Sequence, residues 1–248
     1  DKRGFNYINK KKYKIKLIDL PKLKINIISL VPFLIKFILS ILKSYLFLYK
    51  NKIEILISTG GYMSVPVCIA ARLLNLKVFL FEPNLVIGRS NLFLLNYCEK
   101  IFTYDKKIKN LPKKMCHKNF VIKPLIRKEI FLSKKKLKKN SKLFSILIIG
   151  GSQGARKFDN LFNEDLIKLS KKIKIKVYHQ TSVKNLRELK NFYISNNIDF
   201  HIFSYTHNLH KIIKKCDFAI TRSGASTINE LVFLETPFLA VPYLYAKD

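Results

Sequence analysis

Apolar positions along the chain form short continuous runs, and several of these runs lead into stretches where apolar residues recur with helical period. This arrangement, with glycines between its two parts, occurs three times, at 52–76, 143–172 and 216–237. Further short apolar runs stand at 77–82, 174–180 and 237–242. The runs predict strands and the periodic stretches predict helices. Strands that alternate with helices indicate βαβ units, so we expect an α/β protein with parallel sheets.

A lysine-rich stretch divides these units into two sets. The segment "SKKKLKKNSK" at 133–142 has almost no apolar period, which is typical of a solvated linker. We therefore expect an N-terminal lobe at 1–132 and a C-terminal lobe at 143–248. The chain begins without Met and ends at "YLYAKD" without a closing helical pattern. For this reason both lobes are expected to be incomplete at their outer ends.

The apolar stretch at 25–49 is close to the roughly 20 residues that a membrane span needs. Pro32 interrupts it, and Lys36 and Lys43 lie seven residues apart on one helical face. Three interpretations remain open: a helix packed in the lobe that exposes an apolar, lysine-rimmed patch to a bilayer surface, a buried helix, or a span.

The formal net charge is +31, and only seven of the 47 basic residues are Arg. Such an excess suggests a polyanionic partner, either nucleic acid or an anionic membrane surface, although a lysine-rich composition alone would also produce it. Nucleic-acid recognition favours Arg forks and clustered aromatic platforms, and neither is present here. We expect no nucleic acid as partner. The four cysteines show no C-x-x-C spacing, so neither a zinc site nor a redox pair is indicated.

Glycine turns between strand and helix carry the candidate chemistry. At the carboxyl edge of a parallel sheet, such a turn offers the free N–H groups of a helix start to an anion. The turn at "GGSQGAR" holds Gly150, Gly151 and Gly154, and Ser152 adds a hydroxyl, which suits a diphosphate. Its spacing is neither the dinucleotide fingerprint nor the Walker loop. The alternative, that the glycines serve only tight packing, stays open.

The other candidate residues could also have purely structural roles. Thr227 and Glu230 fit a capping box, in which they would only satisfy the first N–H groups of a helix. Arg127 and Asn84 would be ordinary surface residues on spacing alone. His207 and His210 lack a third metal ligand and are interpreted as a helix start. No D-x-D or H-E-x-x-H motif occurs, so neither a metal nor a cofactor is expected.

Taken in order, five stretches resemble the MurG family: "STGGYMSVP", "FEPNLVIGRSN", "IGGSQGAR", "RSGASTINEL" and "TPFLAVPYLYAKD". Members of this family are membrane-associated transferases that add N-acetylglucosamine to the lipid-linked muramyl-peptide intermediate of peptidoglycan synthesis. The resemblance implies a GT-B type glycosyltransferase with two Rossmann-like parallel-sheet lobes. The donor UDP-GlcNAc would bind the C-terminal lobe, and undecaprenyl-pyrophosphoryl-muramyl-pentapeptide would bind the N-terminal lobe.

The resemblance also implies roles for individual residues. In the donor site, Ser152 would contact the UDP diphosphate within the turn Gly150, Gly151, Gln153 and Gly154, Glu230 would accept from the ribose hydroxyls, and Ala225, Ser226 and Thr227 would line the sugar and phosphate side. The backbone around Thr206 would face uracil, Arg127 would reach the nucleotide, and Asn84 would lie near the transferred sugar. The turn Gly60, Gly61 and Tyr62 would meet the acceptor diphosphate.

The family resemblance places the helix at 27–49 on the cytoplasmic face of the bacterial inner membrane. The general-base His of the family is expected upstream of residue 1, so the 248 residues are expected to be inactive by themselves. Two rival functions remain: a related diacylglycerol glucosyltransferase, and a basic module that binds polyanions or membranes.

Overall fold

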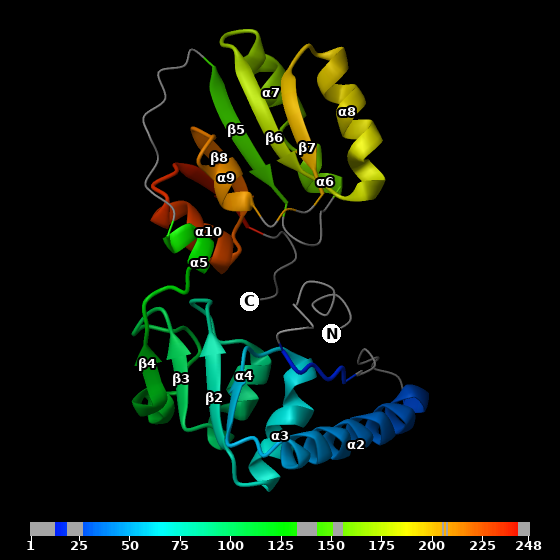
Figure 1. The fold of residues 1–248 in the computed structure, drawn as a ribbon, viewed down its shortest axis with the longest axis vertical. Helices are drawn as coiled ribbons and strands as arrows, with labels where there is room; N and C mark the ends of the chain where they lie inside the picture. The colour runs from blue at the N-terminus through cyan, green and yellow to red at the C-terminus, as the bar shows by residue number, and fades with distance from the viewer. Residues whose placement is uncertain are drawn as a thin grey trace. The chain divides into compact units, whose positions relative to one another are not determined.

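The computed structural model describes residues 13–18, 27–132, 143–150, 156–204, 206 and 208–242. The chain divides into two units, Asp1–Lys123 and Pro124–Asp248, each built around one sheet (Figure 1). The predicted linker at 133–142 lies outside the described residues, so its role as a linker stays a prediction. Helix α5, Lys128–Phe131, precedes that segment and belongs to the second unit.

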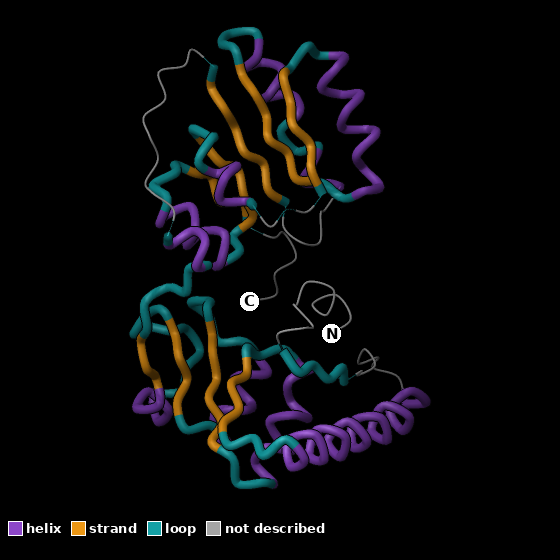
Figure 2. Tube along the Cα trace, in the orientation of Figure 1, coloured by secondary structure: helices purple, strands orange, loops and turns teal. Residues whose placement is uncertain are grey.

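The first unit contains a sheet of four parallel strands in the order β1-β2-β3-β4. The strands are β1 (Ile55–Ser58), β2 (Lys77–Glu82), β3 (Lys100–Thr103) and β4 (Asn119–Val121). The helices are α2 (Ile27–Lys50), α3 (Val65–Leu73) and α4 (Arg89–Leu94), with 3₁₀ turns at η1 (Tyr62–Ser64), η2 (Leu95–Tyr97) and η3 (Lys113–Lys118). Helices α3 and α4 pack on the sheet (Figure 2). The buried residues Val78, Leu80 and Ile101 lie in the resulting core.

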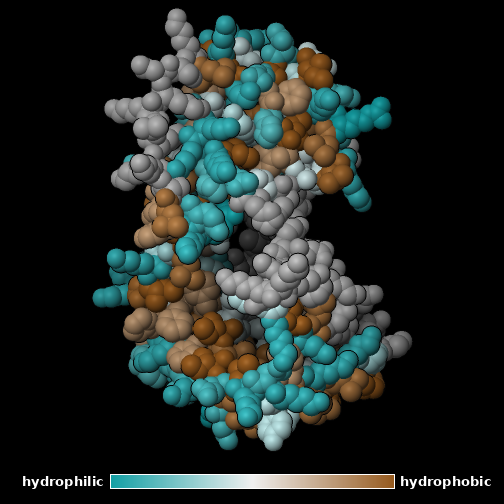
Figure 3. Space-filling model, in the orientation of Figure 1, coloured by the Kyte–Doolittle hydropathy of each residue, from teal (hydrophilic) through white to brown (hydrophobic). Residues whose placement is uncertain are grey.

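Side chains alternate between the two faces of the first sheet. In β2, Val78, Leu80 and Glu82 are buried, whereas Phe79 and Phe81 are only half-buried. Phe79, Phe102 and Phe120 stand on neighbouring strands, with ring centroids 5.7 and 5.8 Å apart. Figure 3 shows hydrophobic side chains at the surface of the first unit. One face of the sheet therefore carries an aromatic row that is partly exposed.

Helix α2 packs against α3 through a narrow face and exposes a broad apolar one. Ser40 and Ser44 are buried, and their hydroxyls donate to the carbonyls of Lys36 and Ser40 at 2.7 and 2.6 Å. On α3, the small residues Ala70 and Ala71 are fully buried. The exposed apolar residues of α2 are Val31, Leu34, Ile35, Ile38, Leu39, Leu42, Leu46 and Tyr49. Leu48 is buried on the same packed face, and Ile41 and Tyr45 are partly buried against the core. The interpretation of this segment as an ordinary buried helix is wrong, because most of its apolar residues remain exposed.

The second unit contains a sheet of five parallel strands in the order β7-β6-β5-β8-β9. The strands are β5 (Phe144–Ile149), β6 (Ile175–Gln180), β7 (Asp199–Phe203), β8 (Phe218–Arg222) and β9 (Phe238–Val241). The other elements are α6 (Arg156–Asp159), α7 (Asn163–Ser170), η4 (Val183–Asn185), α8 (Leu186–Ser195), α9 (Leu209–Ile213) and α10 (Ala225–Phe233).

The central strand β5 is covered on both faces, which explains its continuous apolar sequence. Ile146 and Ile148 join a core cluster with residues of α7 and α8. Leu147 and Ile149 point to the other face and join a second cluster with residues of α5, α9 and α10. Because successive strand residues point to opposite faces, a strand buried on both sides needs apolar residues at most positions, and Ser145 is the one polar residue of β5.

The structure confirms the predicted α/β class with two parallel-sheet lobes. Strands were predicted within one residue of β2, β6 and β9 at both ends. Strands β3, β4 and β7 were not predicted. They have four, three and five residues, and their sequences "KIFT", "NFV" and "DFHIF" carry no apolar run long enough to stand out.

Candidate functional site

The strand order of the second sheet reverses at β5. From β5 the chain adds β6 and β7 on one side, and then returns to place β8 and β9 on the other. Ile149 pairs with Thr221, so the carboxyl ends of β5 and β8 lie next to each other. Ligands of open α/β sheets bind in the crevice at such a topological switch point. The turns that follow Ile149 and Arg222 contain the glycine motifs selected from the sequence, and this position supports their role in binding.

Helix α10 begins at this switch point with an unprotected amino end. Its N-cap is Gly224, no side chain caps it, and its first turn contains no acid. Ala225 and Thr227 are half-buried and Ser226 is exposed. The first N–H groups of a helix have no partner within the helix and carry a partial positive charge. The end of α10 is therefore suited to an anionic ligand.

The capping-box alternative for Thr227 and Glu230 is wrong. The helix starts at Ala225, two residues before Thr227, and Thr227 is therefore already inside the first turn. Glu230 lies further along the helix, where the backbone N–H groups are already paired. Its side chain is consequently free to act elsewhere.

Glu230 and Arg127 form a bidentate ion pair. Arg127 Nε donates to Glu230 Oε1 at 2.6 Å, and Nη2 donates to Oε2 at 2.7 Å. The Glu230 side chain is 7% exposed and the Arg127 side chain is 42% exposed. The two residues that the family resemblance assigned separately to the nucleotide are thus held together in one unit. Direct contact of either residue with a nucleotide stays a prediction.

Packing of α5 against α10 brings Arg127 to this position. Arg127 is the N-cap residue of α5, Ile130 is fully buried, and the rings of Phe131 and Phe233 stack with centroids 5.9 Å apart. His210 on α9 belongs to the same neighbourhood. Burial, together with the nearby charges of Lys211 and Arg127, lowers the pKa of His210 and favours its neutral form.

Thr206 and Gly150 lie on the carboxyl edge of the second sheet. Thr206 follows β7, is half-buried, and its Oγ1 accepts from the main-chain N–H of Asn208 at 3.0 Å. Gly150 directly follows β5. Gly151, Ser152, Gln153 and Gly154 lie outside the described residues, as does His207, so their predicted roles stay predictions. Arg222, at the end of β8, places its guanidinium 5.6 Å from the ring centroid of Phe158 on α6.

A buried polar network supports α6, the helix that follows the glycine turn. Asp159 Oδ2 accepts from Thr181 Oγ1 at 2.6 Å and from Asn185 Nδ2 at 2.8 Å. Asp159 Oδ1 faces His179 Nε2 at 3.6 Å, and His179 Nδ1 lies 2.7 Å from the hydroxyl of Tyr193. The sequence analysis missed this network. One feature of the sequence could have indicated the buried histidine. Ile175, Val177 and His179 are alternate residues of β6, so His179 lies on the same buried face as the two apolar residues.

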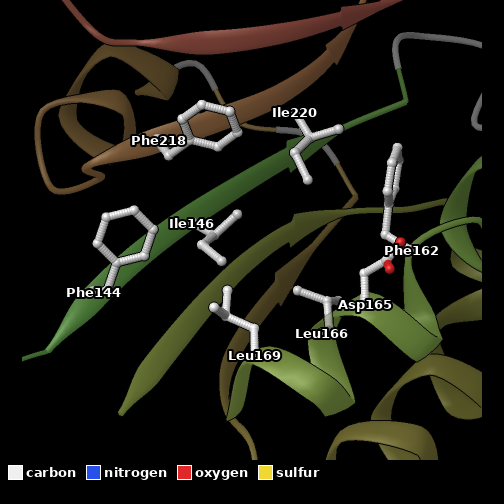
Figure 4. Close-up of a pocket in the computed structure, with 8 residues that line it drawn as sticks. All are labelled: Phe144, Ile146, Phe162, Asp165, Leu166, Leu169, Phe218 and Ile220. Atoms are coloured by element: carbon white, nitrogen blue, oxygen red, sulfur yellow. The ribbon is translucent and has the colours of Figure 1, made fainter. Parts of the chain in front are cut away.

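A pocket of about 310 Å³ in the second unit does not coincide with the switch point. Its lining residues come from the faces of β5 and β8 and from α7, and Figure 4 shows their side chains around it. They are Phe144, Ile146, Phe162, Asp165, Leu166, Leu169, Phe218 and Ile220. All but Asp165 are apolar. A sugar nucleotide needs convergent polar groups, so the carboxyl edge of the sheet is the better candidate site.

In the first unit, the turn Gly60, Gly61 and Tyr62 follows β1 at the carboxyl edge of its sheet. Gly60 and Gly61 have φ values of +79° and +80°, which L-residues rarely adopt. Ser64 is the N-cap residue of α3, but its hydroxyl donates to Gly61 O at 2.8 Å and caps no helix N–H. Asn84 follows β2 at the same edge of the sheet and is exposed. This sheet edge brings together the residues predicted to contact the acceptor and the transferred sugar.

No group of three or more His, Cys, Asp or Glu side chains that could hold a metal ion occurs within the described part of the chain. One described helix, at Val31–Lys50, is long and apolar enough to cross a membrane by length and composition.

Two family models match the chain. The glycosyltransferase family 28 N-terminal domain matches residues 1–103, and the glycosyltransferase family 28 C-terminal domain matches residues 145–248. MurG from Acinetobacter baumannii has a similar fold, with a TM-score of 0.66 and 22% identity over 95% of this chain and 64% of that chain. The fold, the switch point in the second sheet and the two domain matches define the class of this protein. It is a two-domain nucleotide-sugar glycosyltransferase of family 28.

Two relatives narrow this class. A UDP-N-acetylglucosamine–N-acetylmuramyl-(pentapeptide) pyrophosphoryl-undecaprenol N-acetylglucosamine transferase of Pelagibacter ubique is 45% identical over 248 residues, 100% of this chain and 69% of its own length. The protein of the same name from Rickettsia canadensis is 32% identical over 87% of this chain and 62% of its own length. The chain belongs to this family, the MurG family.

Proposed function

We propose that this protein transfers N-acetylglucosamine from UDP-GlcNAc to the 4-hydroxyl of undecaprenyl-pyrophosphoryl-muramyl-pentapeptide, a step of peptidoglycan synthesis. The observation that carries the proposal is the 45% identity over all 248 residues with a relative whose name states this transfer. The geometry of the second unit supports it, because an uncapped helix end and a buried carboxylate lie along the same helix at the switch point.

In the proposed donor site, the diphosphate lies against the turn that contains Gly150, Ser152 and Gly154 and against the amino end of α10. The ribose hydroxyls donate to Glu230. A carboxylate has about four lone-pair positions, and the Arg127 fork uses two of them, so Glu230 keeps acceptor capacity for a ligand. Uracil faces the backbone around Thr206. Arg127 orients the carboxylate of Glu230 and in this way contributes to nucleotide binding.

The proposed reaction is a direct displacement at the anomeric carbon. The muramyl 4-hydroxyl attacks, its proton passes to a general base, the bond to the UDP oxygen breaks, and the configuration at the sugar inverts. Negative charge develops on the departing UDP. In this proposal the free N–H groups of α10 and the Ser152 hydroxyl stabilise that charge, because donors fixed in place before the reaction need no reorganisation as negative charge develops.

The proposed acceptor site uses the first unit. Gly60, Gly61 and Tyr62 meet the acceptor diphosphate, and Asn84 lies near the transferred sugar. The exposed apolar face of α2 rests on the anionic cytoplasmic surface of the inner membrane. Lys36, Lys43 and Lys50 are exposed and spaced seven residues apart, so they form one edge of this face, where they meet lipid phosphates.

The test is a transfer assay with the full-length protein, UDP-GlcNAc and either the lipid-linked muramyl peptide or diacylglycerol. We expect product only with the muramyl peptide. Ser152→Ala is expected to lower turnover and UDP affinity by about 10- to 100-fold, the loss of one hydrogen bond to a charged group. The control is Ser195→Ala, which changes an exposed serine at the end of α8. Transfer to diacylglycerol, or unchanged kinetics in Ser152→Ala, contradicts the proposal.

A further inference from the structure

Glu82 places a buried carboxylate at the carboxyl end of β2, next to the proposed acceptor site. The residue is 3% exposed. Its Oε1 accepts from the main-chain N–H of Asn84 at 3.2 Å and from Asn84 Nδ2 at 2.9 Å. Its Oε2 accepts from the main-chain N–H of Gly88 at 2.9 Å and from Asn91 Nδ2 at 3.0 Å. All of these donors are neutral amides.

The position of Glu82 is unusual for a carboxylate. It shares the inward face of β2 with Val78 and Leu80, where an apolar residue would pack without desolvating a charge. A buried carboxylate persists only when its lone pairs are filled by hydrogen bonds. Here the donors come from two places, the loop that follows β2 and helix α4. The carboxylate therefore fixes these two segments relative to the end of β2.

The first of these contacts orients Asn84. The main-chain N–H of this residue and one N–H of its side-chain amide donate to Glu82 Oε1. The amide cannot be reversed, because that would set its carbonyl oxygen against a carboxylate oxygen. Asn84 is exposed, so its carbonyl oxygen and the second N–H of its amide can face a ligand.

The second contact supports the glycine turn. Asn91 on α4 is 2% exposed, and its Nδ2 also donates to the carbonyl of Phe81 at 3.3 Å. The Asn91 amide lies directly behind Gly60, where a Cβ would come within 2.9 Å of Nδ2 and 3.0 Å of Oδ1. Glu82 thus holds the amide against which the turn at Gly60 rests.

We propose that Glu82 is a positioning residue for glycosyl transfer. Its carboxylate sets the Asn84 amide toward the sugar and supports the turn Gly60, Gly61 and Tyr62 that meets the acceptor diphosphate, without touching either substrate. This inference rests on the proposed function. It predicts that loss of the carboxylate slows transfer and weakens acceptor binding, while UDP binding, which uses the second unit, is unchanged.

The experiment compares Glu82→Gln with wild type in the full-length protein. Glutamine has the same shape, but its NH₂ group would face N–H donors that need an acceptor. We expect kcat to fall roughly 10- to 100-fold, because a displacement of about 1 Å at reacting groups costs that much. The KM for the acceptor should rise, and the Kd of UDP should stay within about twofold. The matched control is Glu99→Gln, an exposed carboxylate of the same unit.

A double-mutant cycle separates positioning from a purely structural role. If Glu82 acts through Asn84, the loss caused by Glu82→Gln must be smaller when Asn84→Ala is already present. If Glu82→Gln does not fold, as judged by circular dichroism, Asn91→Ala tests the second contact alone and should raise the acceptor KM.

The outcomes distinguish this inference from the proposed function. A wild-type protein without transferase activity overturns the proposed function. Three other results overturn the role of Glu82 and leave the proposed function in place. The first is wild-type kinetics in Glu82→Gln, and the second is additive losses in the cycle together with a parallel loss of UDP binding. The third is an unchanged acceptor KM in Asn91→Ala.

Discussion

Arg127 and Glu230 stand 103 residues apart in the sequence, and their side chains form two parallel hydrogen bonds of 2.6 and 2.7 Å. Glu230 is buried on α10, and Arg127 begins α5. A fork of this kind fixes the plane of the carboxylate as well as its position. The oxygens of Glu230 are therefore oriented before any nucleotide arrives.

We expect this pair to matter more for nucleotide binding than for folding. Arg127→Lys keeps the charge but loses the planar fork, and Glu230→Gln loses the charged acceptor. Each should weaken UDP binding by about 10- to 100-fold, as for a hydrogen bond to a charged group. Because Arg127 is partly exposed, the change in unfolding free energy for Arg127→Lys should stay near or below about 1 kcal/mol. Calorimetric titration with UDP and urea unfolding measure the two effects. Equal losses in both would mean that the pair only joins α5 to α10.

The two glycines of the first-unit turn should respond differently to alanine. Both have positive φ, so each substitution should cost about 1–3 kcal/mol in backbone strain. Space is open around a Cβ at Gly61, whereas a Cβ at Gly60 would meet the Asn91 amide. Gly60→Ala should therefore cost about 1–3 kcal/mol more than Gly61→Ala, since Asn91 would lose buried hydrogen bonds. Urea unfolding of the full-length protein measures the difference. Gly224→Ala is the control, because its φ is −78° and its surroundings are open. Equal costs at Gly60 and Gly61 would contradict the packing of Asn91 against the turn.

Acid should weaken the second unit through Asp159. Burial alone would raise the pKa of this carboxyl, but the facing His179 and the hydrogen bonds from Thr181 and Asn185 lower it overall. A lowered pKa in the folded state stabilises the protein at pH values above the unfolded pKa of about 4, and this contribution is lost as the pH falls through the folded pKa.

Asp159→Ala leaves buried donors without an acceptor and should cost about 2–4 kcal/mol at neutral pH, less at pH 3. Asp159→Asn keeps an acceptor oxygen and should cost less at neutral pH. Unfolding in urea between pH 3 and pH 7 provides the measurement, with Asp199→Asn, an exposed partner of Lys176, as the control. A pH-independent cost of Asp159→Ala would show that the charge of Asp159 is irrelevant.

The exposed face of α2 should bind anionic vesicles. Ile38→Glu and Leu42→Glu introduce charge at positions that are 56% and 53% exposed. Each should reduce the fraction that sediments with phosphatidylglycerol vesicles by at least about tenfold, since a buried apolar side chain contributes about 1.5–3 kcal/mol. Val183→Glu, at an apolar residue of the second unit that is 73% exposed, is the matched control. An equal effect of all three variants would argue against α2 as the membrane face.

The amino-acid sequence by itself determined the class of fold and the positions of the turns. The apolar runs "FSILII" and "KVFLFE" predict the strands β5 and β2. Gly60 and Gly61 mark the turn after β1, because their positive φ excludes most other residues. These features depend on neighbours in the chain, so they can be predicted from the chain alone.

Only the tertiary structure decided which side chains meet. The return of the chain from β7 to β8 sets Thr221 beside Ile149 and creates the switch point, and the packing of α5 on α10 pairs Arg127 with Glu230. The start of α10 at Ala225 removed the capping alternative for Glu230. The four donors around Glu82 come from a loop and a helix that follow its strand. Such contacts arise from packing between segments that are separate in the sequence. The periodicity of apolar residues within each segment therefore does not predict them.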